Sequence, residues 1–310
     1  VTLRVSNLDP RPVSFALEER IPVSEVEQVK VTLDPELTRP AARPIDRAAG
    51  RVEASGDPML DIRHLSKVYP DGTKGLDDVT FSVAPGEFVV IIGLSGSGKS
   101  TLLRCINRLI EPTSGQVVLD GVDITAARPG ALRAIRRDIG MIFQQFNLVK
   151  RSSVLTNVLT GRLGSVATLP SVFGFWSAAD RATALANLEL VGIAAKADSR
   201  ADALSGGQQQ RVGIARALMQ NPKLILADEP VASLDPATSH TVLDYLRTLN
   251  TERGVTVLCS LHFLSLAREY GTRIIALKDG RLMFDGQPRD IDEARFKAIY
   301  GEDAVEVEIR

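Results

Sequence analysis

The sequence has few cysteines and no long apolar run. Its two cysteines, Cys105 and Cys259, both lie in apolar segments, and no spacing of cysteine and histidine is typical of a zinc site. We therefore expect two buried thiols in a reducing cytosol rather than a disulfide. No apolar stretch approaches the ~20 residues that span a bilayer. The N-terminus also shows no charged segment followed by an apolar one, the pattern of a secretory signal.

An excess of charge of either sign is lacking too, because the formal net charge is −1. No global field therefore favours nucleic acid or an acidic membrane. The remaining composition, with 44% hydrophobic and 24% charged residues, is typical of a globular protein with ample material for a core. A chain of 310 residues suggests about two domains.

Residues 1–58 differ from the rest of the chain. Seven of the 16 prolines lie there, and residues 39–44 and 48–56 resemble linker. The alternating stretch 23–33 could form one strand, but a lone strand cannot bury a core. We expect a largely disordered N-terminal extension. Because the chain starts with Val1 and Met59 precedes the first convincing strand, we also hypothesise that the native protein starts at Met59, which its intact mass from the source organism would test.

Residues 93–101 read Gly-Leu-Ser-Gly-Ser-Gly-Lys-Ser-Thr and fit G-x-x-x-x-G-K-[ST], the Walker A phosphate-binding loop. An apolar strand is predicted at 88–92 and a helix at 101–109, the context that this loop requires. Glycines let backbone N–H groups surround an anion, and the helix start favours negative charge. A glycine-rich turn that matches by chance is the weaker alternative. The predicted nucleotide-binding residues of the loop are Gly93, Ser95, Gly96, Ser97, Gly98, Lys99, Ser100 and Thr101.

Within this loop Lys99 is expected near the β- and γ-phosphates, and the Ser100 hydroxyl is expected on Mg²⁺. A pair of acidic residues also supports a metal-nucleotide site, because Asp228 and Glu229 follow the apolar strand 224–227. Asp228 suits Mg²⁺ as a hard oxygen ligand, and Glu229 is placed to orient or deprotonate an attacking water. A charged strand end that merely faces solvent is the alternative, which the Walker A loop disfavours.

Residues 204–208, Leu-Ser-Gly-Gly-Gln, open a helix that is predicted to run to 219. A serine and two glycines at a helix start form a second possible anion site. The alternative is a plain N-cap, for which Ser205 is well suited. Because one Walker A loop leaves no need for a second phosphate cradle, the economical explanation is that Ser205, Gly207 and Gln208 serve a nucleotide bound to another subunit.

The pattern from residue 59 onward alternates strands and helices. Residues 60–65 and 79–83 alternate apolar and polar side chains, as half-exposed antiparallel strands do. Residues 146–220 are predicted to be mostly helical. Further strands are expected at 115–121, 139–144, 255–259, 273–277 and 281–284, with a terminal helix at 292–300. Together they predict an α/β fold with a mainly parallel core.

The order of these motifs, with Ser233-Leu234-Asp235 and His262 added, resembles the ATPase subunits of ABC transporters over residues 59 to about 302. Within that family the chain most resembles the ATPase subunits of phosphonate importers. That closer match lies in residues 104–115, 143–149, 227–236 and 266–270. The resemblance implies a P-loop NTPase domain at 59–302 with an antiparallel β-subdomain and a helical subdomain at about 146–220, then a tail at 303–310. Leu94 and Phe263 depart from the family pattern at positions without chemistry.

The resemblance also implies roles for single residues. Tyr69 is similar to the aromatic residue that stacks on adenine, although it could be a simple strand-end tyrosine. Gln144, rather than its neighbour Gln145, resembles the glutamine that contacts Mg²⁺ and the attacking water and senses the permease. Asp235 resembles the residue that crosses the dimer interface, and His262 the histidine on the γ-phosphate. The implied catalytic set is Glu229, His262, Gln144 and Lys99.

Two copies would then sandwich two ATP molecules, each site combining Walker A, Asp228, Glu229 and His262 of one chain with Ser205, Gly207 and Gln208 of the other. The implied function is ATP hydrolysis that energises phosphonate uptake, with Mg²⁺ as cofactor. The implied partners are two permease subunits and, indirectly, a substrate-binding protein, with no nucleic acid. The implied location is peripheral, on the cytoplasmic face of the cell (inner) membrane.

Two other functions stay open at this point. An importer ATPase for polar amino acids shares the stretch Phe-Gln-Gln-Phe-Asn-Leu at 143–148. A non-transport ABC switch, acting in DNA repair or on the ribosome, belongs to a different class. The short helical subdomain, without a coiled-coil insertion or a second ATPase cassette, argues against that class.

Overall fold

The computed structural model describes residues 42–46, 51–54, 57–166 and 174–302. The predicted disorder of residues 1–41, the possible strand at 23–33 and the tail at 303–310 lie outside the described residues. The prediction of a linker is wrong for residues 42–46 and 51–54. There, β1 (Ala42–Asp46) and β2 (Arg51–Ala54) pair antiparallel, with Ala42 opposite Ala54. The register shifts between Pro44 and Asp46, and bulges and edge strands are the places where a sheet accepts proline.

A six-stranded sheet forms the centre of the molecule, in the order β12-β11-β5-β10-β9-β8. Neighbouring strands are parallel from β11 to β8, and only β12 pairs antiparallel. The strands β5, β8, β9 and β10 are buried along their whole length, as expected for a parallel sheet covered on both faces. Their bounds are β5 Phe88–Ile92, β8 Ile139–Ile142, β9 Leu224–Ala227, β10 Thr256–Ser260, β11 Arg273–Lys278 and β12 Arg281–Gly286.

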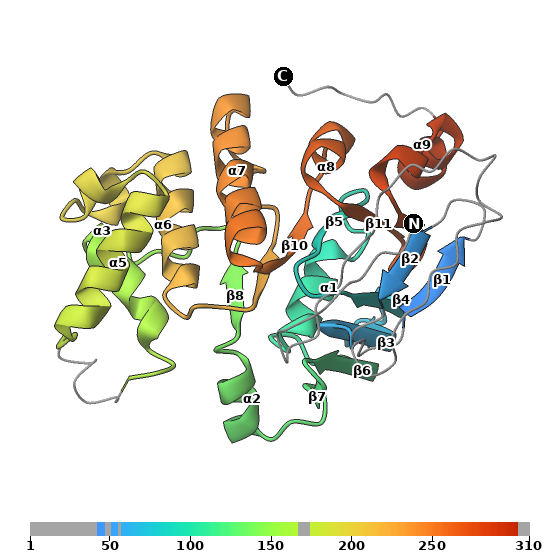
Figure 1. The fold of residues 1–310 in the computed structure, drawn as a ribbon, viewed down its shortest axis with the longest axis horizontal. Coiled ribbons are helices and arrows are strands. Elements are labelled where there is room, and N and C mark those ends of the chain that lie inside the picture. The colour runs from blue at the N-terminus through green and yellow to red at the C-terminus, as the bar shows by residue number, and fades with distance from the viewer. Residues whose placement is uncertain (1–41, 47–50, 55–56, 167–173, 303–310) are drawn as a thin grey trace, which may run out of the picture.

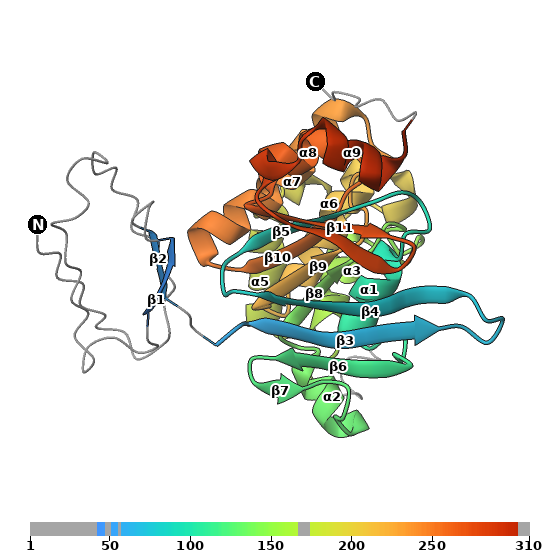
Figure 2. The same cartoon turned by 90° about the vertical axis from the view of Figure 1, so that its right-hand side faces the viewer.

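A second sheet of four antiparallel strands lies on one side of the central sheet (Figure 2). Its order is β4-β3-β6-β7, with β3 at Leu60–Val68, β4 at Lys74–Val83, β6 at Ser114–Leu119 and β7 at Val122–Asp123. Buried residues alternate with exposed ones along β4, because only one face of this sheet meets the core. The predicted antiparallel strands are confirmed.

Helix α1 (Lys99–Ile106) packs between the two sheets, where Leu102, Leu103 and Ile106 are fully buried with residues of β3, β5 and β9. The opposite face of the central sheet packs on α7 (Pro236–Arg253) and α8 (Leu264–Tyr270). Alternate residues of β5 point to the two cores: Val89 and Ile91 to one, Val90 and Ile92 to the other. Helix α9 (Glu293–Tyr300) follows the last strand.

A group of helices lies beside β8, at the edge of the central sheet (Figure 1). It contains α3 (Val154–Leu159), α5 (Ala178–Leu190) and α6 (Gly206–Leu218). Helix α2 (Pro129–Ile135) connects β7 to β8 and lies at the lower edge of Figure 1. Trp176 is partly buried against the core of the helix group. Among the described helices, none has the length and apolar character needed to cross a bilayer.

Candidate nucleotide site

The Walker A loop joins the end of β5 to the start of α1, and its backbone passes close to other chain segments. Gly93, Gly96 and Gly98 all have positive φ angles, of 145°, 81° and 105°. A Cβ atom on Gly93 would lie 2.2 Å from the Leu277 carbonyl oxygen. Glycine is therefore required there both by conformation and by space.

Lys99 is buried at the centre of this loop, with 3% of its surface exposed. Its Nζ donates to the carbonyl oxygens of Gly93 at 2.8 Å and Leu94 at 3.0 Å. Burial lowers the pKa of Lys99, while the nearby carboxylates of Glu229 and Asp228 oppose that shift. A buried cation whose hydrogen bonds go only to carbonyl oxygens is a favourable partner for a phosphate.

Ser97 gives a second sign that the loop is built around a ligand. Its side chain is buried, and its hydroxyl oxygen has no hydrogen-bond partner within the described part of the chain. Buried hydroxyls are normally hydrogen-bonded. A polyphosphate would give the Lys99 ammonium a counter-charge and the Ser97 hydroxyl a hydrogen-bond acceptor.

Asp228 follows β9 and is completely buried. It accepts hydrogen bonds from the Ser100 hydroxyl at 2.7 Å, the Arg104 guanidinium at 3.1 Å and the Ser260 hydroxyl at 3.4 Å. The predicted pair Ser100 and Asp228 is therefore brought together. Sequence reasoning missed Arg104 and Ser260. A signal existed for Ser260, because it ends the strand β10 that neighbours β9, and strand ends of a parallel sheet meet at one edge.

Glu229 has a positive φ angle of 48°, a conformation that is unfavourable for a residue with a side chain. Its N–H group donates to the Ser260 hydroxyl at 2.9 Å. Its carboxylate Oε1 lies 2.8 Å from His262 Nε2 and 3.9 Å from Lys99 Nζ. The strained turn thus aims Glu229 at the two other residues that were predicted to meet the γ-phosphate.

Tyr69 follows β3 and reaches the start of α1. Its hydroxyl lies 3.1 Å from Thr101 Oγ1, and a Cβ on Gly75 would come within 2.8 Å of its ring. The aromatic ring is therefore next to the Walker A helix. Helix α1 itself ends three residues earlier than predicted, since Arg108 adopts a φ of 50°.

Five predicted residues do not join this cluster within one chain. Gln144 lies just beyond β8 and is exposed. Ser205 and Gln208 form a capping box at the start of α6. A Cβ on Gly207 would lie 2.4 Å from Thr238 Cγ2. Asp235 is the N-cap of α7, and hydrogen bonds from Thr238 lower its pKa.

A magnesium ion fits the pair Ser100 and Asp228. The described residues contain no group of three or more histidine, cysteine, aspartate or glutamate side chains that could hold a metal alone. Mg²⁺ commonly uses one or two protein oxygens and takes its other ligands from water and substrate phosphates. The Ser100 hydroxyl and the Asp228 carboxylate, next to the Walker A loop, can supply two such protein oxygens.

Comparison with known proteins identifies the class. The sequence pattern of the family "ABC transporter" matches residues 76–232. The solved dimeric structure of a bacterial ABC transporter cassette is 38% identical, with a TM-score of 0.68 over 75% of this chain and 100% of that one. A dimeric post-hydrolysis cassette bound to ADP and Pi is 39% identical, with a TM-score of 0.66 over the same shares. The chain belongs to the ABC transporter family as an ATP-binding cassette, which confirms the predicted family and fold.

One kind of cassette stands out among the relatives. The protein named "Phosphonates import ATP-binding protein PhnC" of Bdellovibrio bacteriovorus is 57% identical over 81% of this chain and 97% of its own length. Its namesake from Bacillus thuringiensis subsp. konkukian is 54% identical over 81% of this chain and 98% of its own length.

Proposed function

We propose that this chain is the ATP-hydrolysing subunit of an importer for phosphonates. The observation that carries the ATPase proposal is the contact of Glu229 with both His262 and Lys99, directly behind a Walker A loop. The identity of 57% to a cassette named for phosphonate import supports the substrate class. The stretch that the chain shares with amino-acid importers covers only residues 143–148, whereas the identity to the phosphonate cassette extends over 252 residues.

Lys99 and the N–H groups at the start of α1 would bind the β- and γ-phosphates, and Tyr69 would stack on the adenine. Glu229 would accept a proton from, or orient, the water that attacks the γ-phosphate in line. His262 would hold Glu229 through their 2.8 Å contact and donate to a γ-phosphate oxygen. Ser100 and Asp228 would hold Mg²⁺, which neutralises charge on the phosphates. Preorganised charge and positioning supply most of the rate enhancement in such sites.

The residues Ser205, Gly207 and Gln208 lie outside this cluster in one chain, which supports a site shared between two copies. The dimeric state of two related cassettes is in line with this arrangement. Asp235 belongs to the same surface, since Gly207 and Thr238 lie side by side at the starts of α6 and α7. Two permease subunits in the cell membrane and a substrate-binding protein complete the proposed importer. This chain would lie on the cytoplasmic face of that membrane, with Gln144 toward the permease.

Reconstitution tests the function. The chain would be assembled in proteoliposomes with the permease and binding protein of the proposed importer, and its ATPase rate measured with methylphosphonate or a polar amino acid outside. We expect methylphosphonate to raise the rate several-fold and the amino acid to leave it unchanged. Stimulation by the amino acid alone would assign the chain to the other importer class.

A further inference from the structure

The C-terminal helix α9 contacts the segment that carries His262. This histidine lies two residues beyond β10, and α8 begins shortly after it, at Leu264. Tyr300, the last residue of α9, donates its hydroxyl hydrogen to the backbone carbonyl oxygen of His262 at 3.4 Å. Helices α8 and α9 lie next to each other in both views of the fold (Figures 1 and 2). The end of the described chain therefore reaches the backbone of a residue that was predicted to meet the γ-phosphate.

The N-cap position of α8 is occupied by a residue that cannot cap the helix. It is Phe263, whose ring has no oxygen to accept a hydrogen bond from the first N–H groups of α8. Its side chain is also only partly held by packing, because 38% of its surface is exposed. A contact from another element can therefore decide where the segment with His262 lies.

Helix α9 provides a fixed base for such a contact. Phe296 and Ile299 are buried in the hydrophobic cluster that also includes α8. The ring of Phe296 lies 4.9 Å from that of Tyr300, centre to centre, so the tyrosine is held by its neighbour. Just before α9, the Ile291 carbonyl oxygen accepts a hydrogen bond from Arg268 of α8 at 2.9 Å. The two helices are thus joined at both ends of α8.

Helix α9 is also tied to the strand that borders the Walker A loop. Lys278, at the end of β11, donates to the carbonyl oxygen of Ala298 at 2.7 Å. Gly280, two residues further on, donates its N–H group to the carbonyl oxygen of Ser97 in the loop at 3.1 Å. The helix that contacts the segment with His262 therefore has its position set relative to the phosphate-binding loop.

We propose that Tyr300 is a positioning residue for His262 in ATP hydrolysis. Its contact with the carbonyl group keeps the imidazole where Nε2 lies 2.8 Å from Glu229 and can reach a γ-phosphate oxygen. The contact is long for an O–H···O hydrogen bond, and bonds around reacting groups often shorten only when substrate is bound. This role rests on the proposed function, since it requires His262 to act on the γ-phosphate.

The substitution Tyr300→Phe tests the proposal, because it removes the hydroxyl and keeps the ring that packs on Phe296. The variant would be assembled in the proteoliposomes described above, with methylphosphonate outside. We expect kcat for ATP to fall about three- to tenfold, the range that one neutral hydrogen bond contributes. The KM for ATP should stay as in the parent chain, since the proposed contacts to the bound nucleotide do not involve Tyr300.

Nuclear magnetic resonance gives a readout that a general loss of stability would not move. The chain has three histidines, so the imidazole signals of a histidine-labelled sample can be followed singly. The signal of His262 is assigned by its loss in His262→Gln. In the chain without nucleotide, Tyr300→Phe should shift this signal and leave those of His64 and His240 in place.

The matched control is Tyr245→Phe, which removes the hydroxyl of a half-buried tyrosine on α7 whose ring faces Arg211. It should keep the kcat and the His262 signal of the parent. An unchanged kcat or an unchanged His262 signal in Tyr300→Phe, or an equal loss in both variants, would overturn the proposal. A parent importer without ATPase activity would instead overturn the proposed function, and the signal of His262 would still show whether Tyr300 positions it.

Discussion

Glu229 combines a left-handed backbone with contacts to His262 and Lys99. Glu229→Gln keeps the size of the side chain but removes its ability to accept a proton. We expect ATP binding to persist and turnover to fall by at least ~10²-fold, the usual contribution of a general base. ATP-bound dimers should accumulate because opening requires hydrolysis, which size-exclusion chromatography with Mg-ATP would show. Glu252→Gln, an exposed glutamate on α7, is the control; a fully active, monomeric Glu229 variant would contradict the assignment.

Lys99 is the buried cation of the Walker A loop. Lys99→Ala removes the charge that would meet the β- and γ-phosphates, so nucleotide affinity should fall by tenfold or more. Equilibrium titration with a fluorescent nucleotide analogue measures this. A substitution of exposed Lys150 by alanine should leave the affinity as it is. If Lys99→Ala bound nucleotide normally, the loop would have another role.

At the scale of the element, the start of α6 is where one subunit would meet the nucleotide of the other. Gly207→Asp is a poor probe, because its Cβ would strike Thr238 of the same chain at 2.4 Å. Ser205→Asp is cleaner, since Ser205 is exposed and is the N-cap of α6, and aspartate caps helices as well as serine does.

The charge of Ser205→Asp would face the incoming γ-phosphate. At ~4 Å and an effective dielectric constant near 20, the repulsion is about 4 kcal/mol. We expect normal folding and near-normal ATP affinity in the monomer, but no ATP-dependent dimer and no hydrolysis. Ser205→Asn is the neutral control of the same shape and should dimerise. Hydrolysis at the normal rate by Ser205→Asp would mean that the site is not shared between subunits.

At the scale of the whole molecule, both hydrophobic clusters draw their described members from between Met59 and Ile299. A fragment of residues 59–302 should therefore fold alone, with a melting temperature within about 4 °C of the full chain, the shift that ~1 kcal/mol causes at this size. Differential scanning calorimetry of both proteins gives the comparison. A fragment that aggregates or melts more than about 10 °C lower would show that the N-terminal segment contributes to the core.

The sequence by itself determined the parts that depend on neighbouring residues. The Walker A loop, the carboxylates after β9 and the caps of α6 and α7 follow from local order, because turn geometry, capping and strand burial act over a few residues. The sequence also determined the fold class, since alternating strands and helices can pack into only a few types of fold. The roles proposed for the site residues are still predictions.

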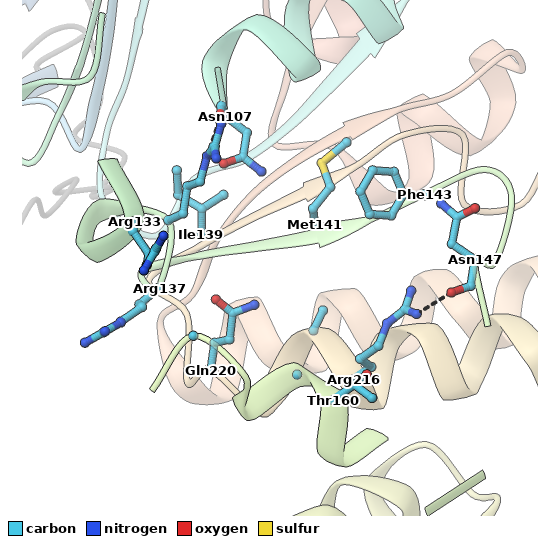
Figure 3. A pocket seen from close by; sticks show the side chains of 14 residues that line it. Asn107, Arg133, Arg137, Ile139, Met141, Phe143, Asn147, Thr160, Arg216 and Gln220 are labelled. Carbon is cyan, nitrogen blue, oxygen red and sulfur yellow. Dashed lines mark hydrogen bonds between the residues drawn. The ribbon is translucent and has the colours of Figure 1, made fainter. Parts of the chain in front are cut away.

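Only the tertiary structure decided which distant residues meet. Ser260 and Arg104 reach Asp228 because β10 pairs with β9 in one register and α1 presents one face to that edge. Arg133 of α2 and Arg216 of α6 line one pocket (Figure 3), although these helices are far apart in the chain. Such contacts depend on long-range packing of whole elements, and no pattern within a short window of sequence encodes them.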